Sequence, residues 1–399
     1  MLDLFGLLVS FAVIVLLVRK NVNFGIAMLV GSLTIGIIAF TPTSLLSTAW
    51  MVISDKTTIN LAAVILCISI LAHLMKRSGQ IDRMTSGLRG LAKDTRAVLS
   101  GFPAIFGLLP VPGGALLSAP MVEEESEKLE VDPKDRTFLN FWFRHIWFYI
   151  FPLFPGLIFA SELSGISIYR LALVQVPMFL AALGVGLFAL RRISSHDEAP
   201  RPRDGGLAKM IKGASPIIIA LVLSMLLGLP IFLALIVAII TSFLIAGPKL
   251  KDPLNVFKEG LSLDLLIAVI GIMLFKGLVE GSGAMVTLKR LIVLHNIPLI
   301  LVATTLPFLI GLVTGSDIGA VGLSFPIVLP LFSEITLPLV SFLYISAFLG
   351  YLVSPLHLCI ILTCDFFSVN LWDVYPPLIA GAGVVFLTAV LTLGLLLGI

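Results

Sequence analysis

Charged residues are scarce in this sequence, at 12% of 399 positions, whereas a soluble domain carries about 25%. So few polar side chains cannot cover the surface of a soluble protein of this length. The net charge of +3 gives no indication of nucleic-acid binding, and no nucleic-acid partner is expected. Cysteine is also rare, and the spacing of Cys67, Cys359 and Cys364 matches neither a metal motif nor a disulfide framework.

The motifs of intramembrane hydrolysis are missing as well. The sequence has no HExxH zinc-protease motif, and Gly315-Ser316-Asp317 is only a near match to the GxGD motif of paired aspartates. Gly281-Ser282-Gly283 invites a serine-protease interpretation, but the sequence alone identifies no dyad partner. We therefore predict that the chain is not an enzyme, has no cofactor and holds no resident metal. An intramembrane hydrolase is the remote alternative.

Apolar residues, in contrast, fill 58% of the chain. Many apolar runs approach the roughly 20 residues that cross a hydrocarbon core about 30 Å thick. The predicted fold class is an all-α polytopic membrane protein, with about ten transmembrane helices and two re-entrant hairpins in two inverted-topology repeats. The first helix lacks a basic leader and a cleavage site, so we expect it to be retained. The spans are predicted at residues 2–18, 24–41, 57–75, 137–160, 166–190, 215–229, 230–246, 264–280, 337–362 and 374–398.

Two further apolar stretches, at about 97–121 and 297–331, are interrupted by glycine and proline. Broken backbone at membrane depth must lie inside protein or line a cavity, so we interpret each stretch as a re-entrant hairpin. This assignment places most Lys and Arg residues on one side, which should be cytoplasmic, and both termini outside the cell membrane. The charged segments 80–96 and 123–136, which flank the first hairpin, are expected to be amphipathic helices at the inner surface. The six exceptions to the charge bias are Lys56, Arg144, Arg170, Lys276, Lys289 and Arg290.

The chain divides into two halves. A polar cytoplasmic linker at 191–214 joins a first repeat, residues 1–190, to a second repeat, residues 215–399. Each half has five spans and one hairpin, and an odd number of crossings inverts the second copy in the membrane. Three patterns recur in the same order at an offset of roughly two hundred residues: 74–91 with 278–291, PVPGGALLSAP (110–120) with TGSDIGAVGLSFP (314–326), and YIFPLFPGLI (149–158) with LVSPLHLCI (352–360).

The first hairpin tip combines helix-ending prolines with glycines that permit a tight turn. A half-helix that starts after this tip would point its free amides at the tip and favour an anion. A Gly/Pro kink inside an ordinary span is the alternative. The substrate-binding residues predicted here are Pro112, Gly113, Gly114 and Ser118.

The second tip carries Asp317, and a carboxylate at membrane depth is costly and usually functional. It is expected either to exchange a proton or to bind Na⁺ together with Thr314 and Ser316, because hard cations prefer oxygen ligands. Thr314, Gly315 and Ser316 are all included in the predicted substrate site. Asp317 can also serve as a helix N-cap, and the two roles are compatible.

Two spans are broken by proline. In 137–160, Arg144 and His145 precede the break; Arg144 is expected either to pair with a substrate carboxylate or to extend toward the cytoplasmic interface. In 337–362, Ser354 is predicted to contribute a hydroxyl to the site. His145 and His357 are candidate proton carriers because histidine titrates near physiological pH, and neutral packing histidines are the alternative.

The order of these elements resembles the ion transporter superfamily, which includes the citrate, dicarboxylate, gluconate and arsenite permeases. GLLPVPGGALLSAPMVEEE (107–125) and SPLHLCIILTCDFF (354–367) are similar to the DUF401 family of membrane proteins. The resemblance implies a substrate site at the hairpin tips and broken spans, and a homodimer. The Ser-Asn-Thr tip motif of the dicarboxylate branch is absent, so dicarboxylate specificity is not implied.

The sequence as a whole predicts a secondary active transporter with the lipid bilayer as its surroundings. Its expected solute is a small organic anion, coupled to H⁺ or Na⁺ in an elevator-like symport cycle. A cation/proton antiporter of the same fold is the alternative.

Overall fold

The computed structural model describes residues 2–92, 94–109, 114–127, 129–193, 205–247 and 252–395. Within these ranges all regular structure is helical, and they contain no strand. Five helical segments in them are long and apolar enough to cross a membrane, or six if a bent pair counts as one span. The all-helical part of the prediction is therefore confirmed, and the apolar helices agree with a polytopic membrane protein. The five segments are Leu2–Arg19, Lys56–Arg77, Gly206–Met225, Leu254–Gly281 and Leu371–Gly394.

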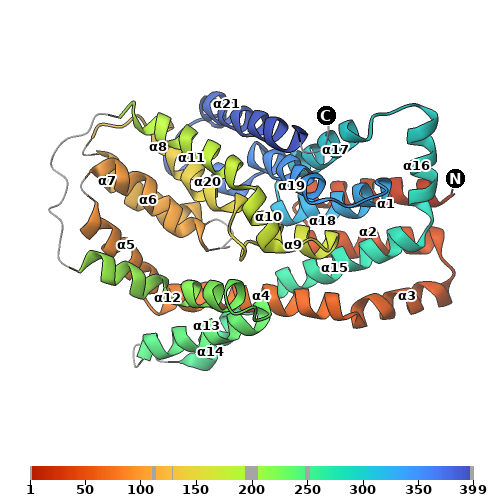
Figure 1. Ribbon diagram of the computed structural model, residues 1–399, viewed down its shortest axis with the longest axis horizontal. Coiled ribbons are helices and arrows are strands. Elements are labelled where there is room, and N and C mark those ends of the chain that lie inside the picture. The colour runs from red at the N-terminus through yellow and green to blue at the C-terminus, as the bar shows by residue number, and fades with distance from the viewer. Residues whose placement is uncertain are drawn as a thin grey trace.

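Twenty-one α-helices and three short helical turns follow one another along the described ranges (Figure 1). Residues before the linker form α1 (Leu2–Arg19), α2 (Phe24–Ala39), α3 (Pro42–Ser54), α4 (Lys56–Arg77), α5 (Gln80–Leu91), α6 (Thr95–Gly107), α7 (Ala115–Glu127), α8 (Pro133–His145), η1 (Ile146–Tyr149), α9 (Pro155–Ser164), α10 (Ile168–Val174) and α11 (Val176–Leu190). Residues after it form α12 (Gly206–Met225), α13 (Ile231–Ala246), α14 (Pro253–Gly260), α15 (Leu263–Gly281), α16 (Ala284–Leu294), α17 (Leu299–Thr314), α18 (Asp317–Val328), η3 (Leu329–Leu331), α19 (Leu337–Leu352), α20 (Leu358–Phe366), α21 (Leu371–Ala389) and η4 (Val390–Gly394).

Both Gly/Pro-rich stretches contain a pair of helices, as expected. In the first, α6 ends at Gly107 and α7 begins at Ala115; in the second, α17 and α18 are separated only by Gly315 and Ser316. The α6/α7 pair lies on the left in Figure 1, and the α17/α18 pair lies on the right, with α9 and α10 between them. The two pairs therefore approach the middle of the molecule from different sides.

Both proline-broken spans are interrupted where the sequence predicts. The first break follows η1, and α9 begins at Pro155, whose missing amide proton costs nothing at the first position of a helix. The second break separates α19 from α20, and it includes Ser354 and His357. Helix α9 continues into α10 through a bend of 115°, which directs the chain away from the break.

Glycines allow the first helix of each pair to pack closely on a broken span. A Cβ added at Gly107 of α6 would collide with the Arg144 carbonyl of α8. A Cβ added at Gly311 of α17 would collide with the Ala347 carbonyl of α19. Small residues at such contacts are typical of helix packing in membranes, because they let backbones approach.

Several boundaries differ from the prediction. Segment 123–136 is not one surface helix: α7 ends at Glu127, Glu130 turns with φ 50°, and Asp132 caps α8. Segment 166–190 is two helices that meet at Gln175, where Pro177 in the first turn of α11 favours a new helix start. The sequence also did not predict the short helices α3 and α14. Both are shorter than a full span, so their sequences lack a span-length apolar run.

Candidate functional site

The site is built around a cavity of about 270 Å³ between the broken spans and the second hairpin. Three helices, α9, α18 and α20, contribute residues from their first turns, so helix N-termini surround it. Such ends carry unpaired amides and partial positive charge, which stabilise an anion. The lining residues are Arg144, Phe148, Phe154, Pro155, Leu265, Gly315, Ser316, Asp317, Ile318, Tyr351, His357, Leu358 and Cys359.

The second hairpin tip is shaped by local backbone requirements. Gly315 ends α17 with φ 59°, in the left-handed region that favours glycine. A Cβ added there would lie 2.6 Å from the Leu356 carbonyl oxygen, so the tip also packs against the second break. Ser316, not Asp317, is the N-cap of α18: its Oγ accepts a hydrogen bond of 3.1 Å from the Gly319 amide. The expected capping role thus belongs to Ser316, and the Asp317 side chain lines the cavity.

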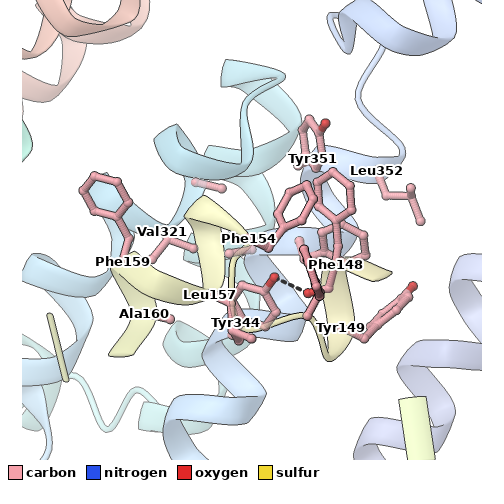
Figure 2. Close-up of a cluster of buried hydrophobic side chains, with 14 of the residues drawn as sticks. Phe148, Tyr149, Phe154, Leu157, Phe159, Ala160, Val321, Tyr344, Tyr351 and Leu352 are labelled. Carbon is pink, nitrogen blue, oxygen red and sulfur yellow. Dashed lines mark hydrogen bonds between the residues drawn. The ribbon is translucent and has the colours of Figure 1, made fainter. Parts of the chain in front are cut away.

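Asp317 lies beside the start of α9. A Cβ added at Gly156 would stand 3.1 Å from its Oδ2, and the Gly156 and Ile318 backbone amides lie close to the carboxylate. Two helix N-termini from distant parts of the chain therefore face one carboxylate. The Tyr344 hydroxyl donates a 2.6 Å hydrogen bond to the Phe148 carbonyl (Figure 2). This bond joins α19 to η1 in the first broken span. This contact holds in place Phe148, which lines the cavity together with Phe154 and Tyr351.

Arg144 is buried at the end of α8 and lines the cavity. Its Nη1 donates a 2.8 Å hydrogen bond to the Phe106 carbonyl of α6. A Cβ added at Gly114 would collide with the guanidinium, so Gly114, directly before α7, leaves room for this side chain. Arg144 thus connects the first hairpin to the cavity.

His145 and His357 lie side by side, with ring centroids 4.8 Å apart. His357 lines the cavity and stacks on Tyr351 at 3.9 Å between ring centroids. His145 is behind it, between Phe141 and Phe148. The sequence named both residues, but it did not predict that they would meet.

Three further predicted site residues within the described ranges do not line the cavity. Ser118 donates to Asn140 Oδ1 on α8 at 2.6 Å, Thr314 donates to the Ile310 carbonyl at 2.8 Å, and Ser354 donates to the Leu312 carbonyl at 2.6 Å. These hydroxyls hold hairpins and breaks in place. Pro112 and Gly113 lie outside the described residues.

Sequence reasoning did not identify Tyr351, Phe148, Phe154 or Cys359 as cavity residues. The aromatic residues carry no signal among the 27 phenylalanines and 5 tyrosines of the chain. Cys359 follows the second proline break by four residues, so its position after Pro355 was the available signal. The spacing between Cys359 and the other cysteines gave no such indication, because the potential metal ligands beside Cys359 are His145 and His357.

These features define an all-helical protein of the membrane type, with a largely apolar cavity that Arg144, Asp317 and His357 line where its broken helices meet. The chain belongs to a family described as "Protein of unknown function (DUF401)", whose model matches residues 3–397. This confirms the family that the sequence motifs resembled. No curated protein matches the chain.

Proposed function

We propose that this chain is a secondary active transporter that moves a small organic anion by elevator-like alternating access, with protons as the coupling ion. The observation that carries the proposal is the cavity in which Arg144 and Asp317 meet the N-termini of α9, α18 and α20. A buried guanidinium binds carboxylate or phosphate oxygens strongly, and helix N-termini add to the attraction. A carboxylate in the same cavity is suited to carry a proton.

The arrangement of helices supports two related halves. Helix α2 packs on α15, and α13 packs on α4. If α12–α16 are the repeat of α1–α5, then α13 is equivalent to α2 and α15 is equivalent to α4. The two contacts then join equivalent pairs of helices. Helix α9 also packs on α18, and α20 packs on α7. These contacts are equivalent too if α20 is the repeat of α9 and α18 is the repeat of α7. We infer an inverted repeat in which α6/α7 and α17/α18 are re-entrant hairpins, with the basic side cytoplasmic.

Charge balance gives a coupling mechanism. With Asp317 ionised, an anion in the cavity would meet a negative charge a short distance away, in surroundings that screen it poorly. A proton on Asp317 removes this repulsion and leaves Arg144 and the helix ends to hold the anion. Proton and anion would then bind together and cross together, which is symport.

The hydroxyl groups at the tip favour protons over sodium. Thr314 donates its proton to a backbone carbonyl, and the Ser316 oxygen already accepts from the Gly319 amide. A sodium ion needs several oxygen ligands that converge on it, but these bonds hold both hydroxyls in place within their own hairpin, and Thr314 does not line the cavity. Sodium coupling is therefore the second choice.

The test uses purified protein in liposomes with an imposed pH or sodium gradient and a panel of radiolabelled organic anions. We expect accumulation of at least one anion that follows the pH gradient and disappears with a protonophore. Movement of a cation against protons, with no anion uptake, would instead identify the antiporter. Folded protein that moves nothing under either gradient would contradict the proposal.

A further inference from the structure

Three potential metal ligands meet beside the cavity. One ring nitrogen from each of His145 and His357 and the Cys359 sulfur all lie within 4.8 Å of one another. The residues come from α8, the second break and α20, so only the folded chain brings them together. All three are buried, with exposed fractions of 2%, 1% and 6%.

The hydrogen bonds of the two histidines leave a nitrogen lone pair available on each. His145 Nδ1 is 2.7 Å from the Phe141 carbonyl oxygen, and His357 Nδ1 is 3.2 Å from the Tyr351 carbonyl oxygen. A carbonyl can only accept, so each Nδ1 carries the proton and each neutral Nε2 carries the lone pair. Neither Nε2 has a hydrogen-bond partner among the described residues. Two unsatisfied buried acceptors are costly, and a ligand that binds both removes that cost.

This pattern is the one that metal sites use. A histidine ligand almost always donates its second ring N–H to a carbonyl or carboxylate, which fixes the tautomer and the ring orientation. Zinc takes both imidazole and thiolate ligands, and catalytic zinc sites use three protein ligands with the fourth position open. Here His357 and Cys359 line the cavity, so the fourth position would face it.

Geometry and charge also permit an ion. Zinc–ligand bonds of about 2.0–2.3 Å place neighbouring ligand atoms roughly 3.5 Å apart. Side-chain movements of about 1 Å would therefore bring the three ligand atoms to bonding distance of one ion. Arg144 on the same cavity opposes a cation, whereas the Cys359 thiolate and the Asp317 carboxylate offset it. Cysteine and imidazole together select a thiophilic ion over Na⁺, Mg²⁺ or Ca²⁺.

We propose that His145, His357 and Cys359 form a binding site for a thiophilic divalent ion, of which Zn²⁺ is the best fit. The site goes beyond anion transport and does not depend on it. Binding replaces the Cys359 S–H bond with a sulfur–metal bond and releases that proton to water, so the affinity rises with pH.

The experiment titrates Co²⁺ into the full-length protein in detergent, purified without a histidine tag, and follows the thiolate-to-cobalt charge-transfer band. We expect one Co²⁺ per chain, displaced by Zn²⁺. The band should vanish in Cys359→Ser and persist in Cys364→Ser, a second buried cysteine on the same helix. His145→Gln and His357→Gln should weaken binding by more than about tenfold, whereas His295→Gln, at an exposed histidine, should not.

Folding of each variant is checked by circular dichroism and gel filtration. Folded wild-type protein that binds no Co²⁺, or a band that survives Cys359→Ser, overturns the proposal. The titration uses no anion and no gradient, so its failure is distinct from failure of the transport proposal.

Discussion

The Asp317 carboxylate lies on the backbone of Gly156, so that a Cβ added at Gly156 would stand 3.1 Å from Oδ2. Such a separation is tighter than ordinary van der Waals contact, and Asp317 would have to shift by a few tenths of an ångström. We expect Gly156→Ala to fold but to slow proton-driven uptake by up to about tenfold, because it displaces the coupling group. Initial rates in proteoliposomes measure this effect.

Gly184→Ala is the matched control, because nothing lies within 4 Å of a Cβ added there. Equal uptake by the two variants would show that the close approach of α9 to Asp317 has no functional role.

Replacing Asp317 itself separates coupling from binding. Asp317→Asn keeps the size of the side chain but cannot release a proton at any physiological pH. We expect it to lose accumulation driven by a pH gradient while it still exchanges labelled for unlabelled anion across the membrane. Asp365→Asn, at an exposed aspartate on α20, should retain both activities. Proton-driven accumulation that survives in Asp317→Asn would transfer the coupling role to another residue.

Arg144 is expected to determine affinity for the anion. A hydrogen bond to a charged group contributes about 1.5–3 kcal/mol, so Arg144→Gln should weaken anion binding by roughly 10- to 100-fold. Arg144→Lys keeps the charge but loses the planar fork, and an intermediate affinity is expected. Arg170→Gln changes an exposed arginine and serves as the control. The concentration dependence of counterflow uptake measures these differences, and an unchanged affinity in Arg144→Gln would place the anion elsewhere.

The sequence predicted those features of the site that proline and glycine dictate locally. Gly315 has a positive φ at the tip, and Pro155 opens α9, as residues of these types should. Asp317 and Arg144 also stood out, because charges are rare in apolar segments. Their shared cavity was predicted only through the order of the repeated patterns.

Contacts between distant helices had no comparable signal. Cys359 and His145 meet because α8 and α20 pack together, which no spacing along the chain encodes. The sequence left capping open as an alternative role of Asp317, whereas Ser316 caps α18 in the structure, because serine and aspartate are equally good caps. Helix α3 was not predicted because none of its residues is buried and its length is less than a span.

Acid should loosen the start of α6. Asp94 caps this helix, and its hydrogen bond with the Arg96 side chain lowers the pKa of the Asp94 carboxyl. A carboxyl whose pKa is lowered by folding stabilises the folded state above its unfolded pKa of about 3.9, and this contribution is lost as the pH falls through the folded value. We expect faster amide exchange in the first turn of α6 below about pH 4.

Two variants of Asp94 separate the cap from the charge. Asp94→Asn keeps a capping oxygen and should remove the acid dependence, whereas Asp94→Ala should raise exchange at every pH. An acid dependence that persists in Asp94→Asn would belong to another group.

Membrane sidedness tests the inverted repeat directly. Lys134, just before the first broken span, and Glu334, just before the second, are both exposed. If the halves are inverted copies, these equivalent positions lie on opposite sides of the membrane. In a variant without Cys67, Cys359 and Cys364, we expect Lys134→Cys to react with a membrane-impermeant maleimide only from the cytoplasmic side. Glu334→Cys should react only from the outside, as measured in whole cells and inverted vesicles. Labelling of both positions from one side would mean that the chain crosses the membrane an even number of times between them, as it would if the α17/α18 pair crossed completely, and this would contradict the inverted repeat.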